Sequence, residues 1–179
     1  MSRTRVYVAC SLDGFIAGPD GDLSWLPEGD PSAVPGSGGV GFHAFIADVG
    51  ALLMGRNTYD FLAGYGGPWH YGERPVLVAT HRDCRRIHEL VRPVQGDIAS
   101  LVAQGKAAAG GKDLYIDGGI LIRQALDAGL VDECIVTLIP TVLGDGVPLF
   151  AGTTRRHAFL CASHETHGDG LVQLHLRPR

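Results

Sequence analysis

Two short segments each combine an apolar run with a glycine turn and the expected start of a helix. The first is residues 51–59, Ala-Leu-Leu-Met-Gly-Arg-Asn-Thr-Tyr, and the second is residues 114–122, Leu-Tyr-Ile-Asp-Gly-Gly-Ile-Leu-Ile. In both, the apolar run is typical of a buried strand, and glycine allows a sharp turn or a close approach to a ligand. The free N–H groups and positive dipole end of the following helix suit a phosphate.

Side chains at the first turn add to this chemistry. Arg56 supplies a permanent cation and Thr58 a hydroxyl at the same helix start. Two such turns in one small protein indicate a ligand with two phosphate regions, such as a dinucleotide. Neither turn is a G-x-G-x-x-G fingerprint, and each taken alone is equally typical of an ordinary connection between a strand and a helix.

Composition limits the classes of protein to consider. The chain has 179 residues, of which 45% are hydrophobic and 19% charged, and a formal net charge of −4. These values predict one globular domain over residues 1–179 and argue against a nucleic-acid partner. No apolar stretch reaches membrane-spanning length and the N-terminus runs directly into a strand, so we expect a cytoplasmic protein with no membrane partner. The scattered cysteines and histidines form no complete ligand set, which predicts no metal site.

Expected strands and helices alternate along most of the chain. Strands are expected at residues 6–11, 51–54, 75–80, 89–95, 114–116 and 134–139, helices at 40–48, 57–62, 98–108 and 120–128, and a closing hairpin at 158–163 and 171–176, while residues 15–17 form a short apolar piece. This order predicts an α/β fold with a mixed, mostly parallel central sheet, helices on both faces and a C-terminal antiparallel hairpin. Residues 27–41 and 64–72 are expected to form long loops.

Several ordered motifs carry a resemblance to a known family. Residues 8–17 resemble an S-x-D-G-x-I-A turn, residues 54–59 resemble M-G-R-x-T-Y, and residues 129–133 with 140–150 resemble G-L-V-D-E followed by P-x-x-L-G-x-G-x-P-L-F. The chain thus resembles the dihydrofolate reductase superfamily and, more closely, stand-alone relatives of the C-terminal reductase domain of the bifunctional riboflavin-biosynthesis deaminase–reductase. A zinc deaminase half is not expected, because no H-x-E with P-C-x-x-C occurs.

The resemblance implies NADPH as the cofactor and assigns residues to parts of it. Ala9 and Ile16 correspond to the backbone around the nicotinamide. The implied phosphate-side residues are Gly55, Arg56, Asn57 and Thr58 at the first turn, Thr80, His81 and Arg82 around the adenosine 2′-phosphate, and Gly118, Gly119, Ile120 and Leu121 at the pyrophosphate. The hydride chemistry would then belong to the cofactor, and the protein would supply position and electrostatics.

The substrate side departs from the folate reductases. Their pterin-binding acid opens the helix before M-G-R, whereas residues 38–43 contain no carboxylate. Asp30 follows Trp25 at the family's spacing and is one candidate catalytic residue. Thr137 matches a threonine beside the substrate acid, or is simply a good β-former. Asp117 resembles the acidic position of the riboflavin branch, or is a partly exposed aspartate at a strand end.

The resulting hypothesis is an NADPH-dependent reductase that transfers hydride to a small pterin-like or pyrimidine-like heterocycle, similar to the 5-amino-6-(5-phosphoribosylamino)uracil reductases. Trp25, Trp69 and Tyr71 would stack on that substrate, or would plug a small core. The alternatives are a true dihydrofolate reductase and a catalytically silent NADP(H)-binding module. We also expect a homodimer, because riboflavin-type domains pair through sheet edges and strands 134–139 and 158–163 are apolar enough to need cover.

Overall fold

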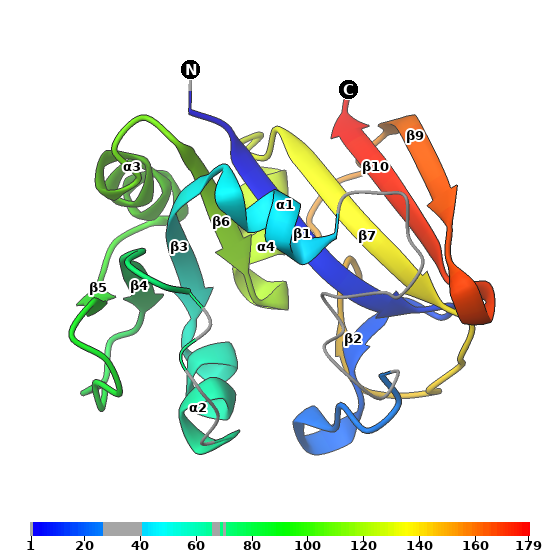
Figure 1. The fold of residues 1–179 in the computed structure, drawn as a ribbon, viewed down its shortest axis with the longest axis horizontal. Helices are drawn as coiled ribbons and strands as arrows, with labels where there is room; N and C mark the ends of the chain where they lie inside the picture. The colour runs from blue at the N-terminus through cyan, green and yellow to red at the C-terminus, as the bar shows by residue number, and fades with distance from the viewer. Residues whose placement is uncertain (1, 27–40, 66–68, 70) are drawn as a thin grey trace.

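The computed structural model describes residues 2–26, 41–65, 69 and 71–179. Most of its strands join one eight-stranded sheet (Figure 1). These strands are β1 Thr4–Ser11, β3 Val49–Gly55, β4 Val76–Ala79, β5 Val91–Val94, β6 Asp113–Asp117, β7 Glu133–Ile139, β9 Phe159–Thr166 and β10 Val172–Pro178. Their order across the sheet is β5-β4-β3-β6-β1-β7-β10-β9. A second, two-stranded sheet pairs β2 (Phe15–Ala17) with β8 (Val147–Pro148).

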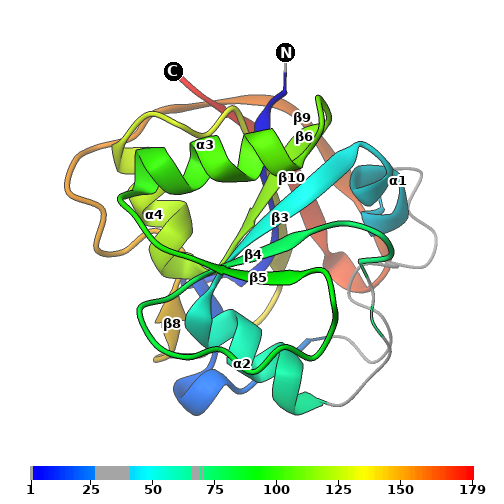
Figure 2. The same ribbon diagram turned by 90° about the vertical axis from the view of Figure 1, so that its left-hand side faces the viewer.

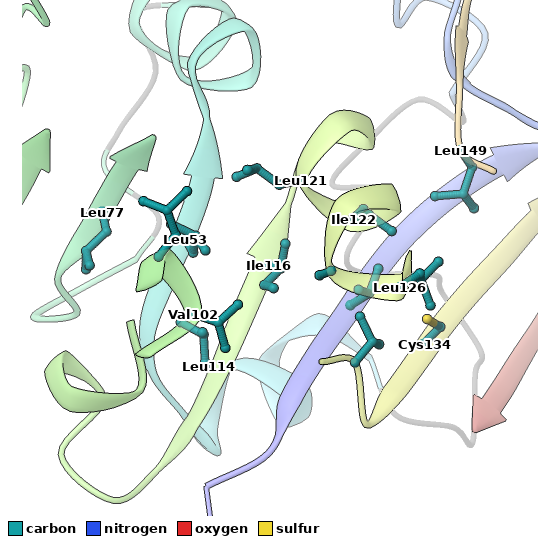
Figure 3. Close-up of a cluster of buried hydrophobic side chains, with 14 of the residues drawn as sticks. Leu53, Leu77, Val102, Leu114, Ile116, Leu121, Ile122, Leu126, Cys134 and Leu149 are labelled. Atoms are coloured by element: carbon teal, nitrogen blue, oxygen red, sulfur yellow. The ribbon is translucent and has the colours of Figure 1, made fainter. Parts of the chain in front are cut away.

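Helices cover both faces of the large sheet. They are α1 Phe42–Ala47, α2 Arg56–Tyr65, α3 Ile98–Ala108 and α4 Gly119–Asp127, with short 3-10 turns at Pro19–Gly21 and Gly168–Gly170. The helices α3 and α4 lie on one face (Figure 2), where Val102, Ile122 and Leu126 pack with Leu53 and Ile116 of the strands (Figure 3). On the other face, a second core gathers side chains from α1 and α2 against the sheet.

The strand directions confirm the predicted fold class. From β5 across to β7 the strands are parallel, and β10 and β9 add an antiparallel hairpin.

The helix expected at residues 98–108 is confirmed at both ends. Its start is fixed locally, because the Asp97 carboxylate accepts a hydrogen bond from the Ser100 N–H at 2.7 Å.

The two short strands β2 and β8 were not predicted as strands, and the family-like motifs explain their pairing. The Asp13 carboxylate accepts hydrogen bonds from the Ser11 hydroxyl (2.6 Å) and from the backbone N–H groups of Leu143 (3.1 Å) and Gly144 (2.7 Å). Gly146 has a φ of +147°, and a Cβ there would lie 2.1 Å from the Ala17 carbonyl oxygen. Only glycine fits so close an approach. These contacts join two distant motifs and hold β8 beside β2.

Strand β7 corrects one expectation. Residues 134–139 were expected to need cover from a second subunit, but β7 lies inside the sheet between β1 and β10, and only Leu138 among its side chains is not fully buried. The β9 edge, by contrast, is mostly exposed, with Leu160 47% accessible. Within the described residues, no helix combines the length and apolarity needed to cross a bilayer.

The sheet changes the direction of its connections between β3 and β6. Helix α2, which follows β3, packs on the same face of the sheet as α1. Helix α4, which follows β6, packs on the opposite face. β3 and β6 are neighbours, so the two glycine turns lie side by side. A Cβ on Gly118 would lie 2.8 Å from the Thr58 hydroxyl oxygen and 3.4 Å from the Gly55 nitrogen. In open α/β sheets, ligands bind outside the carboxyl ends of the strands at such a switch point.

Candidate functional site

A cleft of about 600 Å³ opens at this switch point. It extends from the end of β4 to β7 and is closed on one side by residues of the β2–β8 pair. Thirteen residues predicted from the sequence lie along it: Ala9, Ile16, Gly55, Arg56, Asn57, Thr58, Tyr71, Asp117, Gly118, Gly119, Ile120, Leu121 and Thr137. The structure therefore brings both glycine turns and two of the three candidate catalytic residues to one cavity.

The remaining predicted cofactor residues, Thr80, His81 and Arg82, line a second hollow of about 490 Å³. Arg56 connects this hollow to the cleft. Its Nη1 donates to the Thr80 hydroxyl oxygen (3.2 Å) and to the Asp83 carbonyl oxygen (2.8 Å), while its Nε forms an ion pair with Asp60 at 2.7 Å. Arg56 thus braces the turn after β4 against α2, which the sequence alone did not indicate.

The geometry of the two turns fits a dinucleotide. Helix α4 begins after Gly118, whose φ is +104° and which offers no side-chain cap, so the first N–H groups of the helix face the cleft without a capping partner. A Cβ on Gly119 would lie 2.9 Å from the Pro148 carbonyl oxygen. A larger residue at either glycine would collide with neighbouring protein atoms, so the close packing of the two turns requires glycine.

Aromatic side chains form the opposite part of the cleft, which we call the aromatic wall: Tyr7, Phe42, Tyr71 and Tyr115. The ring centroids of Tyr7 and Phe42 are 5.7 Å apart, and those of Phe42 and Tyr115 are 6.5 Å apart. Both pairs meet edge to face. Such a surface suits the faces and edges of a flat heterocycle.

Asp117 lies where the aromatic wall meets the second glycine turn. Burial raises the pKa of Asp117 to about 6, against the opposing effects of hydrogen bonds from the Gly118 N–H and the Tyr115 hydroxyl. Burial, and then the charge of Asp117, also raise the pKa of Tyr71 and Tyr115, which places both rings close to this carboxyl group. The cleft therefore holds an acid that can exchange a proton near neutral pH.

Thr137 is held by a residue that the sequence did not single out. Gln173, buried in β10, donates from Nε2 to the Thr137 hydroxyl oxygen (3.0 Å) and to the Tyr7 hydroxyl oxygen (3.2 Å). Because the Thr137 oxygen accepts this bond, its own O–H is available to donate to a group in the cleft. Thr137 therefore lines the cleft with its hydroxyl group held by Gln173.

Two predicted residues of the described chain, Trp25 and Trp69, are not brought to the cleft. Trp25 donates its indole N–H to the Asp22 carbonyl oxygen at 3.2 Å and does not line the cavity. Trp69 stacks on His88 with centroids 4.5 Å apart, outside the lining. Local partners hold both rings, so neither tryptophan lines the cleft. Asp30 lies outside the described residues.

Two lining residues could have been found from strand periodicity. Tyr7 and Tyr115 stand two residues before Ala9 and Asp117 on β1 and β6, so they share a sheet face with them. Helix α1 has no acidic residue in its first turn, and it directs Phe42 to the cleft where folate reductases would place their acid. The apolar positions Leu23, Leu26 and Phe61 also line the cavity. They carry no comparable sequence signal.

The family model described as the RibD C-terminal domain matches residues 69–173, more than half of the chain. The chain belongs to the RibD C-terminal domain family. Among its relatives, the uncharacterized protein YwjB of Bacillus subtilis (strain 168) is 31% identical over 174 residues, covering 97% of this chain and 96% of YwjB.

Solved structures of RibD-type proteins share the fold. A putative riboflavin biosynthesis protein from Shewanella sp. PV-4 is 33% identical, with a TM-score of 0.85 and 99% of each chain covered. The deaminase and 5-amino-6-(5-phosphoribosylamino)uracil reductase of Thermotoga maritima superposes with a TM-score of 0.69 at 16% identity, over 99% of this chain and 57% of its own. The RibD C-terminal domain described here has the fold of the riboflavin-pathway-type reductases, and its family points to an oxidoreductase.

Proposed function

We propose that this protein is an NADPH-dependent reductase that transfers hydride to a small pterin-like or pyrimidine-like heterocycle. One observation carries the proposal: a single cleft at the topological switch point joins two helix-opening glycine turns to an aromatic wall, with Asp117 between them. The family match supports the oxidoreductase class.

The cofactor-binding residues follow from the two turns. The N–H groups at the start of α4, after Gly118, would hold the pyrophosphate, and the turn around Gly55 and Thr58 would hold the adenosine side. The hollow lined by Thr80, His81 and Arg82 would take the 2′-phosphate. When bound, NADPH supplies the hydride.

The protein residues supply orientation and a proton. The aromatic wall would stack on the heterocycle, and the Thr137 hydroxyl would donate to an acceptor on its edge. The protonated Asp117 carboxyl group would transfer its proton to the ring nitrogen beside the carbon that receives hydride. The substrate then gains one hydride and one proton, and the Asp117 carboxylate is reprotonated from solvent. A carboxyl pKa of about 6 suits this exchange near neutral pH.

The test is NADPH oxidation measured with a panel of dihydrofolate, pterins and ribosylaminopyrimidines. We expect turnover with a pterin or a pyrimidine and less than about 1 s⁻¹ with dihydrofolate, since α1 lacks the acid. Faster folate turnover would favour a true dihydrofolate reductase. NADPH binding with no turnover of any compound would favour a silent binding module.

Asp117 has its own test within the same assay. Asp117→Asn should lower kcat/KM by about 10²–10⁴-fold, the usual contribution of a general acid, while the Kd for NADPH stays unchanged. For the wild type, kcat/KM should fall as pH rises through about 6, because the protonated carboxyl group is lost. Asp145→Asn, at an exposed loop position, is the matched control. A flat wild-type profile over pH 5–8 would remove Asp117 from the mechanism.

A further inference from the structure

The cleft carries very little charge for its size. Among the described residues that line it, Arg56 and Asp117 are the charged ones. Arg56 lies at the first glycine turn and already bonds to Asp60, Thr80 and the turn after β4. On the side of the aromatic wall, where the substrate would bind, the described lining therefore presents one acid and no cation.

Among the described residues, the arginines near this side have other partners. By sequence, residues 27–40 and 66–70 contain no lysine or arginine. Behind the wall, Arg5 lies over the Phe45 ring and forms an ion pair with Glu133 at 2.6 Å. Arg74 donates to the carbonyl oxygens of Val49 and Tyr71. Both arginines thus have partners away from the ligand space.

We propose that the substrate is a flat, amino-substituted nitrogen heterocycle that carries no phosphate. This inference rests on the proposed function and narrows its substrate class. It separates this protein from enzymes whose substrate is a phosphoribosylaminopyrimidine, the class for which the Thermotoga maritima protein is named.

The charges and donors of the site explain the preference. A phosphate group needs arginine, lysine or clustered N–H donors, and beside Asp117 it would meet a carboxylate instead. An amino-substituted ring offers N–H donors to Asp117 and a carbonyl or ring-nitrogen acceptor to the Thr137 O–H, which Gln173 holds ready. The aromatic wall can stack on the ring itself, but it supplies no cation to bind a sugar phosphate.

The experiment compares compounds that differ only in a phosphate. Protein saturated with NADPH is titrated with 5-amino-6-ribosylaminouracil and its 5′-phosphate, and with a hydroxymethyl-dihydropterin and its phosphate ester, and binding is followed by calorimetry. We expect at least one unphosphorylated compound to bind ten times or more tightly than its phosphate ester. Equal or tighter binding of the esters would overturn the inference, and so would failure of all four compounds to bind. If NADPH itself does not bind, the proposed function fails first.

A pair of leucine variants tests the electrostatic explanation. Leu26 lines the cleft, whereas Leu12 is 59% exposed and lies outside the lining. Leu26→Lys should improve binding of a phosphate ester at least fivefold, and Leu12→Lys should leave it unchanged. Equal effects of the two variants would show that the charge of the cleft does not set the preference.

Discussion

Replacing Asp117 with asparagine should stabilise the protein at alkaline pH although it removes the proposed proton donor. Burial raises the pKa of Asp117 to about 6 in the folded protein, above the ordinary value of 3.8. The folded state therefore binds more protons than the unfolded state between about pH 4 and pH 6, and wild-type stability falls as pH rises through that window. Above pH 6 the full cost of the buried charge is present.

The magnitude follows from the gap between the two pKa values. The ionised Asp117 lowers the free energy of unfolding by about 3 kcal/mol at most, and we expect about 2–3 kcal/mol because Asp117 keeps some exposure to the open cleft. In urea unfolding at pH 8, Asp117→Asn should raise the midpoint by roughly 1–1.5 M, and the gain should shrink toward zero as pH approaches 4. Protein concentration is kept constant, since any subunit association also changes apparent stability.

The pH dependence decides the outcome. A gain of the same size at pH 5 and pH 8 would show that asparagine merely packs better, and that the carboxyl group does not titrate with a raised pKa. A loss of stability at pH 8 would mean that the charged form is stabilised by the site, which contradicts the role given to Asp117. The activity should move in the opposite direction to the stability, because active sites often hold groups that destabilise the fold.

Three further predictions concern other parts of the molecule. Asp13→Asn should destabilise the protein above pH 4, because the Ser11 hydroxyl and two backbone N–H groups hold the pKa of Asp13 at about 2. The difference in unfolding free energy between variant and wild type should vanish as pH falls toward 2, and urea unfolding at several pH values measures it. Arg82→Ala should weaken the binding of NADPH ten- to a hundredfold and leave the binding of NADH unchanged, whereas Arg56→Ala should disturb the turn after β4. Equal losses of affinity for both cofactors would show that neither arginine binds the 2′-phosphate. We propose a homodimer that covers the exposed edge at β9, so light scattering at micromolar concentration should give twice the chain mass, and a monomer mass would contradict it.

The fold could be predicted where local chemistry determines the elements. Apolar runs and glycine turns placed the strands and helices of the sheet, and the start expected for α3 is right because the structure shows Asp97 capping it locally. The two-residue strand β8 had no such signal, because it depends on pairing with the distant β2 and on bonds of Asp13 to residues about 130 positions away. For β7, apolarity indicated a strand correctly but not its position, since a central strand and an uncovered edge have the same composition.

The site shows the same division. The glycine turns and Asp117 were visible as motifs, and the structure places them along one cleft. The bracing role of Arg56 and the bond from Gln173 to Thr137 depend on partners 24 or more positions apart, which no local pattern reveals. The ring of Trp69 stacks on the distant His88 and stays outside the cleft lining, whereas Tyr71 of the same predicted loop lines the cleft.

The central claim is that NADPH binds across the two adjacent glycine turns, and a pair of glycine variants tests it most directly. Gly118 has a φ of +104° and a Cβ there would lie 2.8 Å from the Thr58 hydroxyl oxygen, whereas Gly110, with a φ of +59°, has open space around it and lies outside the cleft lining. The Kd for NADPH is measured by cofactor fluorescence for the wild type, Gly118→Ala and Gly110→Ala. We predict binding by the wild type, at least tenfold weaker binding by Gly118→Ala and no change for Gly110→Ala. No binding by the wild type at millimolar NADPH, or equal Kd values for all three proteins, would contradict the claim.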